Sequence, residues 1–286
     1  MNVITCGLNS YLGKASLQYL YDVNFQTHGI VRDQNLLISK LKRPTQTHLY
    51  NFDIVRYTPH SINLSLPACK LAIYFTQTPE LNDIVGANYE LLSIRNFIQF
   101  SKRNNCNRII YVGTIYDRKF LSEIEKLFIE FEVNFTIILK DVAIGEETSF
   151  NDFMRKMLKN KIIFLYKPQK NVSFSPIHLE DFMNWIKNVD WNSNYCNEYV
   201  EYTGANRMEI EQVMNLYQEN LPANKKHKII PIANKRIAKI FNKYFSGVSY
   251  DQYAEYISEI TDRTDIANIK SVKSDIIISS STVTRF

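Results

Sequence analysis

Short apolar runs alternate with longer segments of helical periodicity over the first half of the chain. The apolar runs lack the polar alternation of a half-exposed strand, and the segments between them place apolar residues three or four positions apart. Buried strands separated by helices are typical of a parallel sheet covered on both faces. The pattern predicts a doubly wound α/β domain with strands at 3–6, 28–32, 47–52, 71–75, 108–112 and 135–139 and helices at 11–23, 35–41, 84–102 and 120–131.

The pattern changes after Gly145, where shorter and more mixed segments follow. We therefore expect one domain over residues 1–145 and a smaller, partly interleaved region over residues 146–286. This second region is predicted to be mostly helical. Helices are expected at 150–159, 180–189 and 208–220, extended segments at 161–166, 172–177 and 199–202, and helix followed by irregular chain from 229 onward.

Composition narrows the class of protein only in part. The chain has 286 residues, 45% hydrophobic and 22% charged, which is ordinary for a globular protein with a substantial core. Its net charge of +5 comes from scattered basic residues, which we interpret as solvated faces, so no nucleic-acid partner is expected. No apolar run approaches the ~20 residues that span a bilayer.

The four cysteines show neither C-x-x-C pairing nor the spacing of a metal site. Three of them fall in or beside apolar runs, as small buried hydrophobes do. The chain begins directly on an expected strand, which predicts no targeting segment. We therefore expect a cytoplasmic protein without a bound metal.

The turn after the first predicted strand carries the strongest functional signal. A β-branched run leads into Gly7, and Gly13 follows where the first helix begins. Backbone N–H groups and the helix dipole at such a turn hold a pyrophosphate. The middle glycine of the usual G-x-x-G-x-x-G is replaced by Ser10. A structural interpretation stays open, because any parallel α/β domain needs a glycine after its first strand.

The end of the second predicted strand carries Arg32 and Asp33, about 20 residues after the turn. In dinucleotide-binding folds an acidic residue here contacts the ribose 2′-OH of NAD, whereas an arginine accommodates the 2′-phosphate of NADP. Arg32 therefore favours NADPH over NADH. The alternative is an exposed arginine without a ligand.

Further motifs follow in order along the chain, and together they resemble the atypical short-chain dehydrogenase/reductase group, in particular the NmrA-like NAD(P)-binding proteins. The resemblance covers residues 1–220 and is fainter beyond. It implies a Rossmann-like fold that binds NAD(P). The segments that carry it are 6–13, 29–33, 51–53, 108–114, 176–181 and 202–204.

The resemblance also implies which residues contact the cofactor. The adenine would lie near Asp53, and the ring end near the segments that leave the fourth and fifth strands. The implied cofactor-binding residues are Gly7, Asn9, Ser10, Tyr11, Leu12, Gly13, Arg32, Asp53, Phe75, Thr76 and Thr114.

The catalytic Tyr-x-x-x-Lys of the wider superfamily is missing from the matching stretch. Tyr116 is followed four residues later by Phe120 and not by lysine. Tyr116 could still act as an acid beside Thr114 and Lys119, or it could be a packing tyrosine. His178 and Asp181 lie in the 176–181 segment, where a structural role competes with a catalytic one.

Three functions remain open on these residues. The first is an NADPH-dependent oxidoreductase acting on a small quinone-like or carbonyl molecule, since the cofactor supplies the difficult chemistry and a quinone needs little help from a tyrosine. The second is a non-catalytic NAD(P)-sensing regulatory or scaffold protein with a protein partner. The third is a protein that has lost the cofactor, which Ser10 and the scarcity of glycine would indicate.

Overall fold

Uninterrupted apolar runs form the central strands of a large sheet. The computed structural model describes residues 1–21, 25–58, 64–77, 84–116, 120–145, 148–167, 173–189, 194–220, 227–248 and 268–283. Within them the chain divides into two compact units. Unit 1 is Met1–Leu139, Met183–Glu201 and Ile266–Ser271, and unit 2 is Lys140–Phe182, Tyr202–Asp265 and Val272–Phe286.

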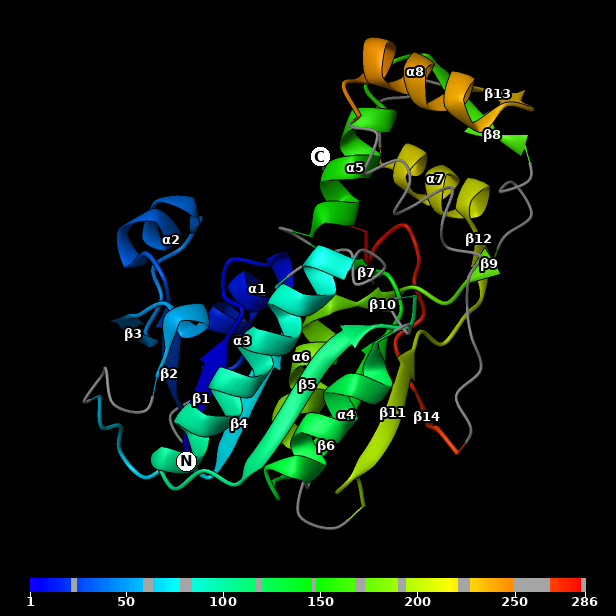
Figure 1. The fold of residues 1–286 in the computed structure, drawn as a ribbon. Coiled ribbons are helices and arrows are strands. Elements are labelled where there is room, and N and C mark those ends of the chain that lie inside the picture. Colours follow the sequence, from blue (N-terminus) through cyan, green and yellow to red (C-terminus); the bar gives the residue numbers. More distant parts are fainter. Residues whose placement is uncertain are drawn as a thin grey trace. The chain divides into compact units, whose positions relative to one another are not determined.

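Unit 1 is built on a sheet whose described strands run in the order β14-β11-β6-β5-β4-β1-β2-β3 (Figure 1). Strand β1 pairs in parallel with β2 on one side and with β4 on the other, so that Ile4 lies opposite His28 and Ala72. The pairs β2 with β3 and β4 with β5 are also parallel. The strands are β1 (Asn2–Cys6), β2 (Gln26–Val31), β3 (His48–Asn51), β4 (Leu71–Phe75), β5 (Arg108–Thr114), β6 (Asn134–Lys140), β11 (Glu198–Thr203) and β14 (Lys270–Lys273).

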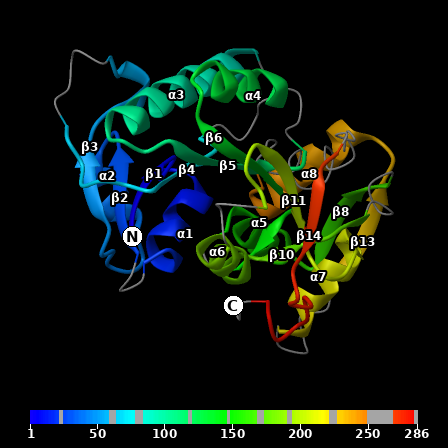
Figure 2. The same ribbon diagram turned by 90° about the horizontal axis from the view of Figure 1, so that it is seen from below.

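Helices cover both faces of this sheet. Figure 2 shows α3 and α4 on one face of the sheet and α1 on the other. Aromatic side chains fill the layer under α3, where the Tyr74 ring lies 5.4 Å from Phe97 and 5.9 Å from Tyr111. The predicted doubly wound, Rossmann-like fold is therefore confirmed. The helices are α1 (Tyr11–Tyr19), α2 (Gln34–Lys40), η1 (Ile54–Arg56, a 3-10 turn), α3 (Ile84–Arg103) and α4 (Leu121–Glu130).

Unit 2 consists of helices and small strand pairs. Parallel pairs join β7 with β10 and β8 with β13, and an antiparallel pair joins β9 with β12. Helix α6 begins in this unit and ends in unit 1. The elements are β7 (Ala143–Ile144), α5 (Ser149–Met157), β8 (Ile162–Tyr166), β9 (Ser173–Phe174), β10 (Ile177–His178), α6 (Leu179–Asn188), β12 (Met208–Glu209), α7 (Ile210–Glu219), β13 (Lys228–Ile232) and α8 (Lys235–Ser246).

Two strands lie where the sequence predicted helix or irregular chain. Strand β13 covers the start of the stretch predicted as helical, and β14 lies in the part predicted as irregular. Pro231 lacks an N–H group, yet it is tolerated because, among the described strands, β13 pairs only with β8. The first helix also ends earlier than predicted, at Tyr19, and residues 22–24 lie outside the described residues.

Candidate functional site

A cavity of about 140 Å³ opens in unit 1 at the carboxyl ends of β1 and β2. Open parallel sheets bind ligands at this edge, where the strand order reverses. Five stretches that are distant in sequence form its walls. They are residues 6–9 of the turn after β1, residues 30–32 at the end of β2, residues 52–54 after β3, Gln77 after β4, and Tyr89 of α3.

Both glycines of the turn are required by close backbone approach. Gly7 has a φ of +79°, and a Cβ atom there would lie 1.9 Å from the carbonyl oxygen of Phe75. A Cβ atom on Gly13 would lie 2.2 Å from the carbonyl oxygen of Gly7. The turn is therefore pressed against the end of β4 on one side and against α1 on the other. Phe75 contacts the glycine turn through its backbone carbonyl, and its side chain is fully buried.

Ser10 braces the turn from within. Its hydroxyl donates to the carbonyl of Gly7 at 2.8 Å and accepts from the N–H of Gly13 at 3.0 Å, so Ser10 is the N-cap of α1. A hydroxyl has one proton to donate, and here that proton is used inside the turn. Ser10 therefore shapes the turn rather than offering its O–H to a ligand. Tyr11 and Leu12 follow as the first residues of α1.

The end of β2 presents a positive charge to the cavity. Arg32 is exposed and lines the cavity. Asp33 is the N-cap of α2, where one carboxylate oxygen accepts from the N–H of Leu36 at 2.9 Å, and Asp33 is not part of the cavity lining. On the α3 side, burial raises the pKa of Tyr89, and the guanidinium of Arg32 opposes that rise. The group available to a ligand at this strand end is therefore a guanidinium.

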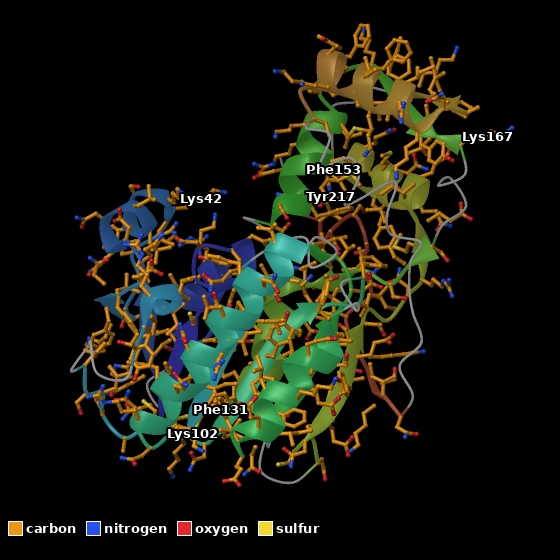
Figure 3. All side chains as sticks on the ribbon, viewed as in Figure 1. Lys42, Lys102, Phe131, Phe153, Lys167 and Tyr217 are labelled. Carbon is orange, nitrogen blue, oxygen red and sulfur yellow. The ribbon has the colours of Figure 1, made fainter. Side chains whose placement is uncertain are left out.

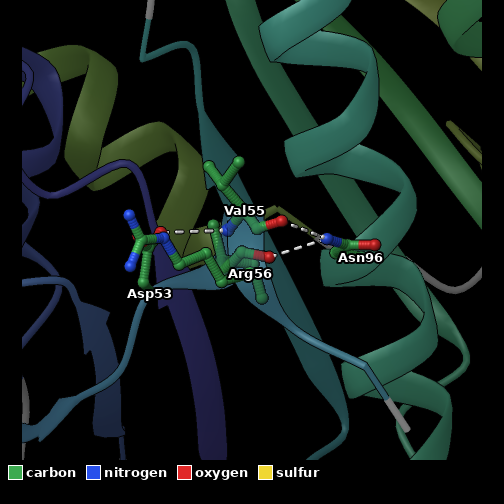
Figure 4. A network of polar contacts seen from close by, with 5 residues as sticks. Asp53, Val55, Arg56 and Asn96 are labelled. Carbon is green, nitrogen blue, oxygen red and sulfur yellow. Dashed lines mark hydrogen bonds and ion pairs between the residues drawn. The ribbon is translucent and has the colours of Figure 1, made fainter.

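Asp53 lines the cavity and also fixes the loop that carries it (Figure 4). Its carboxylate caps η1 by accepting from the N–H of Val55 at 3.1 Å, and it lies 3.7 Å from the Arg56 side chain. Asn96 of α3 donates to the carbonyls of Ile54 and Val55 at 2.9 and 3.0 Å. The loop that carries Asp53 is thus fixed by its own carboxylate cap and by the Asn96 side chain of α3.

Gln77 lies in the segment after β4 where the resemblance implies the ring end of a cofactor, whereas the sequence did not point to Tyr89. The backbone N–H of Gln77 donates to the Glu90 carboxylate at 3.2 and 3.3 Å, and its side-chain amide donates to the Tyr74 hydroxyl at 2.9 Å. Glu90 is fully buried. A signal was present, because Glu90 falls at helical spacing within the buried face of α3, and a carboxylate there needs donors from a neighbouring loop.

Of the other residues expected at the ring end of a cofactor, Thr76, Thr114 and Tyr116 do not line this cavity. The Thr76 hydroxyl lies 2.8 Å from the carbonyl of Val112 and 3.0 Å from the Tyr111 hydroxyl, which ties β4 to β5. Thr114 ends β5, and Tyr116 packs against the unit 1 core. The structure thus brings Gly7, Asn9, Arg32 and Asp53 together, and places Thr76, Thr114 and Tyr116 outside the cavity wall. Lys119 lies outside the described residues.

Asp181 and His178 are two further candidates from the sequence, and both lie in unit 2. Asp181 accepts from the hydroxyls of Tyr202 at 2.8 Å and Ser274 at 2.5 Å, which ties α6 to two other segments of unit 2. Burial raises the pKa of the Tyr202 hydroxyl, and the adjacent Asp181 carboxylate adds to the rise. His178 lies in β10, and no described residue hydrogen-bonds its buried Nδ1 atom. Within the described residues, Asp181 therefore has a bracing role.

Cys6 lines the cavity but is a poor nucleophile. Burial raises the pKa of its thiol to about 12, so the thiol stays protonated at neutral pH. The described residues hold no group of three or more His, Cys, Asp or Glu side chains that could bind a metal. None of the described helices is long and apolar enough to cross a membrane.

Comparison with known proteins finds relatives in structure but not in sequence. No family model matches the chain, and neither does any curated protein. Citrobacter sp. triphenylmethane reductase, solved in complex with NADP(H), has a TM-score of 0.65 and 14% identity, over 92% of this chain and 89% of that one.

Two other solved structures are similar over nearly the whole chain. Leucoanthocyanidin reductase from Vitis vinifera, solved as a ternary complex, has a TM-score of 0.61 and 12% identity, over 96% of this chain and 93% of that one. The Bordetella bronchiseptica enzyme WbmH, solved with NAD+, has a TM-score of 0.61 and 14% identity, over 89% of this chain and 99% of that one.

These likenesses define the class of protein by its fold. The doubly wound sheet with helices on both faces is the fold that this chain shares with these solved structures. The neighbours are consistent with the resemblance to the atypical, NmrA-like group, and what they show is the fold.

Proposed function

We propose that unit 1 binds NAD(P) with the adenosine end in the cavity beside Gly7. The observation that supports this most is the convergence of the glycine turn, Arg32 and Asp53 on one cavity. Structural relatives with NADP(H) or NAD+ support the same class of ligand. A pocket for a drug-sized ligand has ~300–1,000 Å³, so a cavity of about 140 Å³ suits one part of a dinucleotide.

The residues that line the cavity and the turn fit a dinucleotide. Apolar side chains of Leu8, Ile30 and Ile54 offer a flat surface for the adenine, and Arg32 offers charge to a 2′-phosphate. The diphosphate would meet the N-terminus of α1, where backbone N–H groups have no intrahelical acceptor. Ser10 already takes the N–H of Gly13, so the ligand would use N–H groups closer to the start of the helix.

Arg32 makes the phosphorylated cofactor the preferred one. Arg32→Ala should weaken NADPH binding by roughly tenfold or more, the loss expected for one charge-assisted contact, and leave NADH binding unchanged. Titration by calorimetry measures both. Lys40→Ala is the matched control, because it removes an exposed cation from the neighbouring helix α2. Absence of binding of either nucleotide at millimolar concentration would contradict the proposal.

The bound cofactor would supply the redox equivalents for reduction of a small quinone-like or carbonyl molecule. The chain would bind and orient the reactants. Thr114 and Tyr116 lie at the end of β5 and just after it, where the resemblance implies the ring end of the cofactor. A quinone accepts electrons without a strong protein acid, which suits a chain that lacks Tyr-x-x-x-Lys. Oxidation of NADPH with a panel of quinones and aldehydes, repeated with Tyr116→Phe, tests the activity and the tyrosine together.

A non-catalytic NAD(P) sensor with a protein partner is the second candidate. The packing of Tyr116 against the core supports it, since a packed tyrosine is poorly placed to serve as an acid. Nucleotide binding without turnover of any acceptor would favour the sensor. For either function we propose a reducing, cytoplasmic setting, in keeping with four free cysteines, three of them buried.

A further inference from the structure

The strands β8 and β13 and the helix α8 form a strongly basic part of unit 2, here named the basic module (residues 159–167 and 227–248). Eight lysines and arginines lie in these residues, without any Asp or Glu. The whole chain has a net charge of +5, so the rest of the molecule is net negative. Figure 3 shows Lys167 projecting from the end of β8. The eight are Lys159, Lys161, Lys167, Lys228, Lys235, Arg236, Lys239 and Lys243.

Helix α8 packs on the strands through small and polar residues. Ala238, Asn242 and Ser246 are buried and follow one another at four-residue spacing, so they share one face of the helix. The Asn242 side chain donates to the carbonyls of Phe164 at 2.6 Å and Ala238 at 2.8 Å. The inward face of α8 is therefore fixed to β8 by hydrogen bonds and close packing, and at its edge the ring of Phe164 contacts those of Phe241 at 4.8 Å and Phe245 at 5.6 Å.

The other large apolar side chains of α8, and Phe245 itself, are exposed to solvent. Tyr244 is 79% exposed, Phe245 59%, Ile237 43% and Ile240 42%. Residues three, four and seven positions apart lie on one helical face, so Ile237, Ile240 and Tyr244 form a continuous stripe. A helix facing water normally turns its polar side outward. The exposed stripe of α8 therefore needs a partner.

We propose that the stripe of α8 and the surrounding cations dock the protein on an anionic lipid surface. An amphipathic helix that is rich in Lys and Arg and carries Tyr, Phe and Ile on its other side lies in the plane of a membrane interface. Its apolar side chains enter the boundary between headgroups and acyl chains. The cations of the basic module meet the negative headgroups, whose attraction is strongest for clustered Lys and Arg.

Charge argues against the other occupants of the stripe. A two-fold dimer through this face would place the same basic module on both sides of the interface, and like charges would repel. A nucleic acid would neutralise the cations but leave Ile240 and Tyr244 in water. An anionic membrane satisfies both the charge and the apolar stripe.

Vesicle flotation tests the proposal with the full chain. We expect binding to vesicles of phosphatidylcholine mixed with phosphatidylglycerol, no binding to phosphatidylcholine alone, and weaker binding as salt rises. The double variant Ile240→Ser, Tyr244→Ser should lower partitioning roughly tenfold or more, because its apolar area no longer leaves water. The double variant Arg236→Glu, Lys239→Glu should abolish the preference for the mixed vesicles.

A matched control removes apolar area elsewhere. Leu36→Ser with Ile38→Ser changes two residues of α2 that are 47% and 48% exposed, and it should leave vesicle binding unchanged. NADPH titration of each variant reports whether the fold is intact, so failure of docking is separate from failure of nucleotide binding. The proposal is overturned if the wild type ignores the mixed vesicles, if the control loses as much binding, or if the chain is a dimer that Tyr244→Ser dissociates.

Discussion

The glycine turn of unit 1 and the basic module of unit 2 differ in where their apolar residues lie. Those around the turn are buried, whereas several on α8 of the basic module are exposed. Around the turn, the strands β1 and β4 are buried on both faces, and the cavity at their carboxyl ends is lined by the glycine turn and by one guanidinium, that of Arg32. In α8 of the basic module, small and polar residues are buried and the apolar stripe is exposed, although β8 beneath it keeps Ile163 and Leu165 buried. The same hydrophobic pattern thus indicates a core in the first region and a contact surface in the second.

Replacement of two glycines by alanine tests this difference most strongly. Gly7 and Gly247 both have left-handed φ angles, +79° and +67°. A Cβ atom would collide with the Phe75 carbonyl at Gly7 but meet nothing within 4 Å at Gly247. We expect Gly247→Ala to lower the free energy of unfolding by about 1 kcal/mol from strain alone. Gly7→Ala should lower it by roughly 3 kcal/mol and abolish nucleotide binding.

Denaturant unfolding and nucleotide titration measure both variants of this pair. Equal losses of stability at the two positions would contradict the close packing of the turn against β4.

The helix caps give a second, smaller contrast. Ser10 caps α1, and Asn234 caps α8 by accepting from the N–H of Arg236 at 2.9 Å. Each change to alanine should lower the free energy of unfolding by about 1 kcal/mol. Only Ser10→Ala should also weaken NADPH binding, because only that cap braces the turn. Ser10→Gly is the control, with a loss of a few tenths of a kcal/mol. Loss of nucleotide binding in Asn234→Ala would argue against separate roles.

The smallest effect concerns pH and the sheet edge of unit 1. Burial lowers the pKa of His28, and the neighbouring His48 adds to this. A lowered pKa means that the unfolded chain takes up the proton first, so stability should decline from pH ~7 to pH ~5. His28→Asn should flatten that decline by less than ~1 kcal/mol. Urea unfolding over this pH range measures the slope, and an unchanged slope would exclude His28 as its source.

The sequence predicted the fold best where strands are long and apolar. Strands β1, β4, β5 and β6 are continuous buried runs, and their pattern suffices without knowledge of their neighbours. The two-residue pairs of unit 2 have no pattern of their own, because partners more than thirty positions away define them. Strand β13 was missed for a related reason: Pro231 argues against a strand unless the partner is known to leave one edge free.

The site was predicted in part by the same logic. Gly7 and Arg32 lie directly after apolar strands, so their place at the carboxyl edge follows from chain order. Tyr89 reaches the cavity only because α3 crosses near the turn, which no local pattern specifies. The role of the Ser10 hydroxyl depends on a rotamer that the turn itself selects.

That hydroxyl has a consequence for binding kinetics. Because Ser10 closes the turn onto Gly7 and Gly13 without any ligand, the place proposed for the diphosphate is preorganised in the free protein. Association then requires no ordering of the loop, and none of the interaction energy is lost to conformational entropy there. Nucleotide association should accordingly follow a single exponential whose rate constant rises linearly with ligand concentration. This is the behaviour of one-step binding to a preformed site, without a later conformational change.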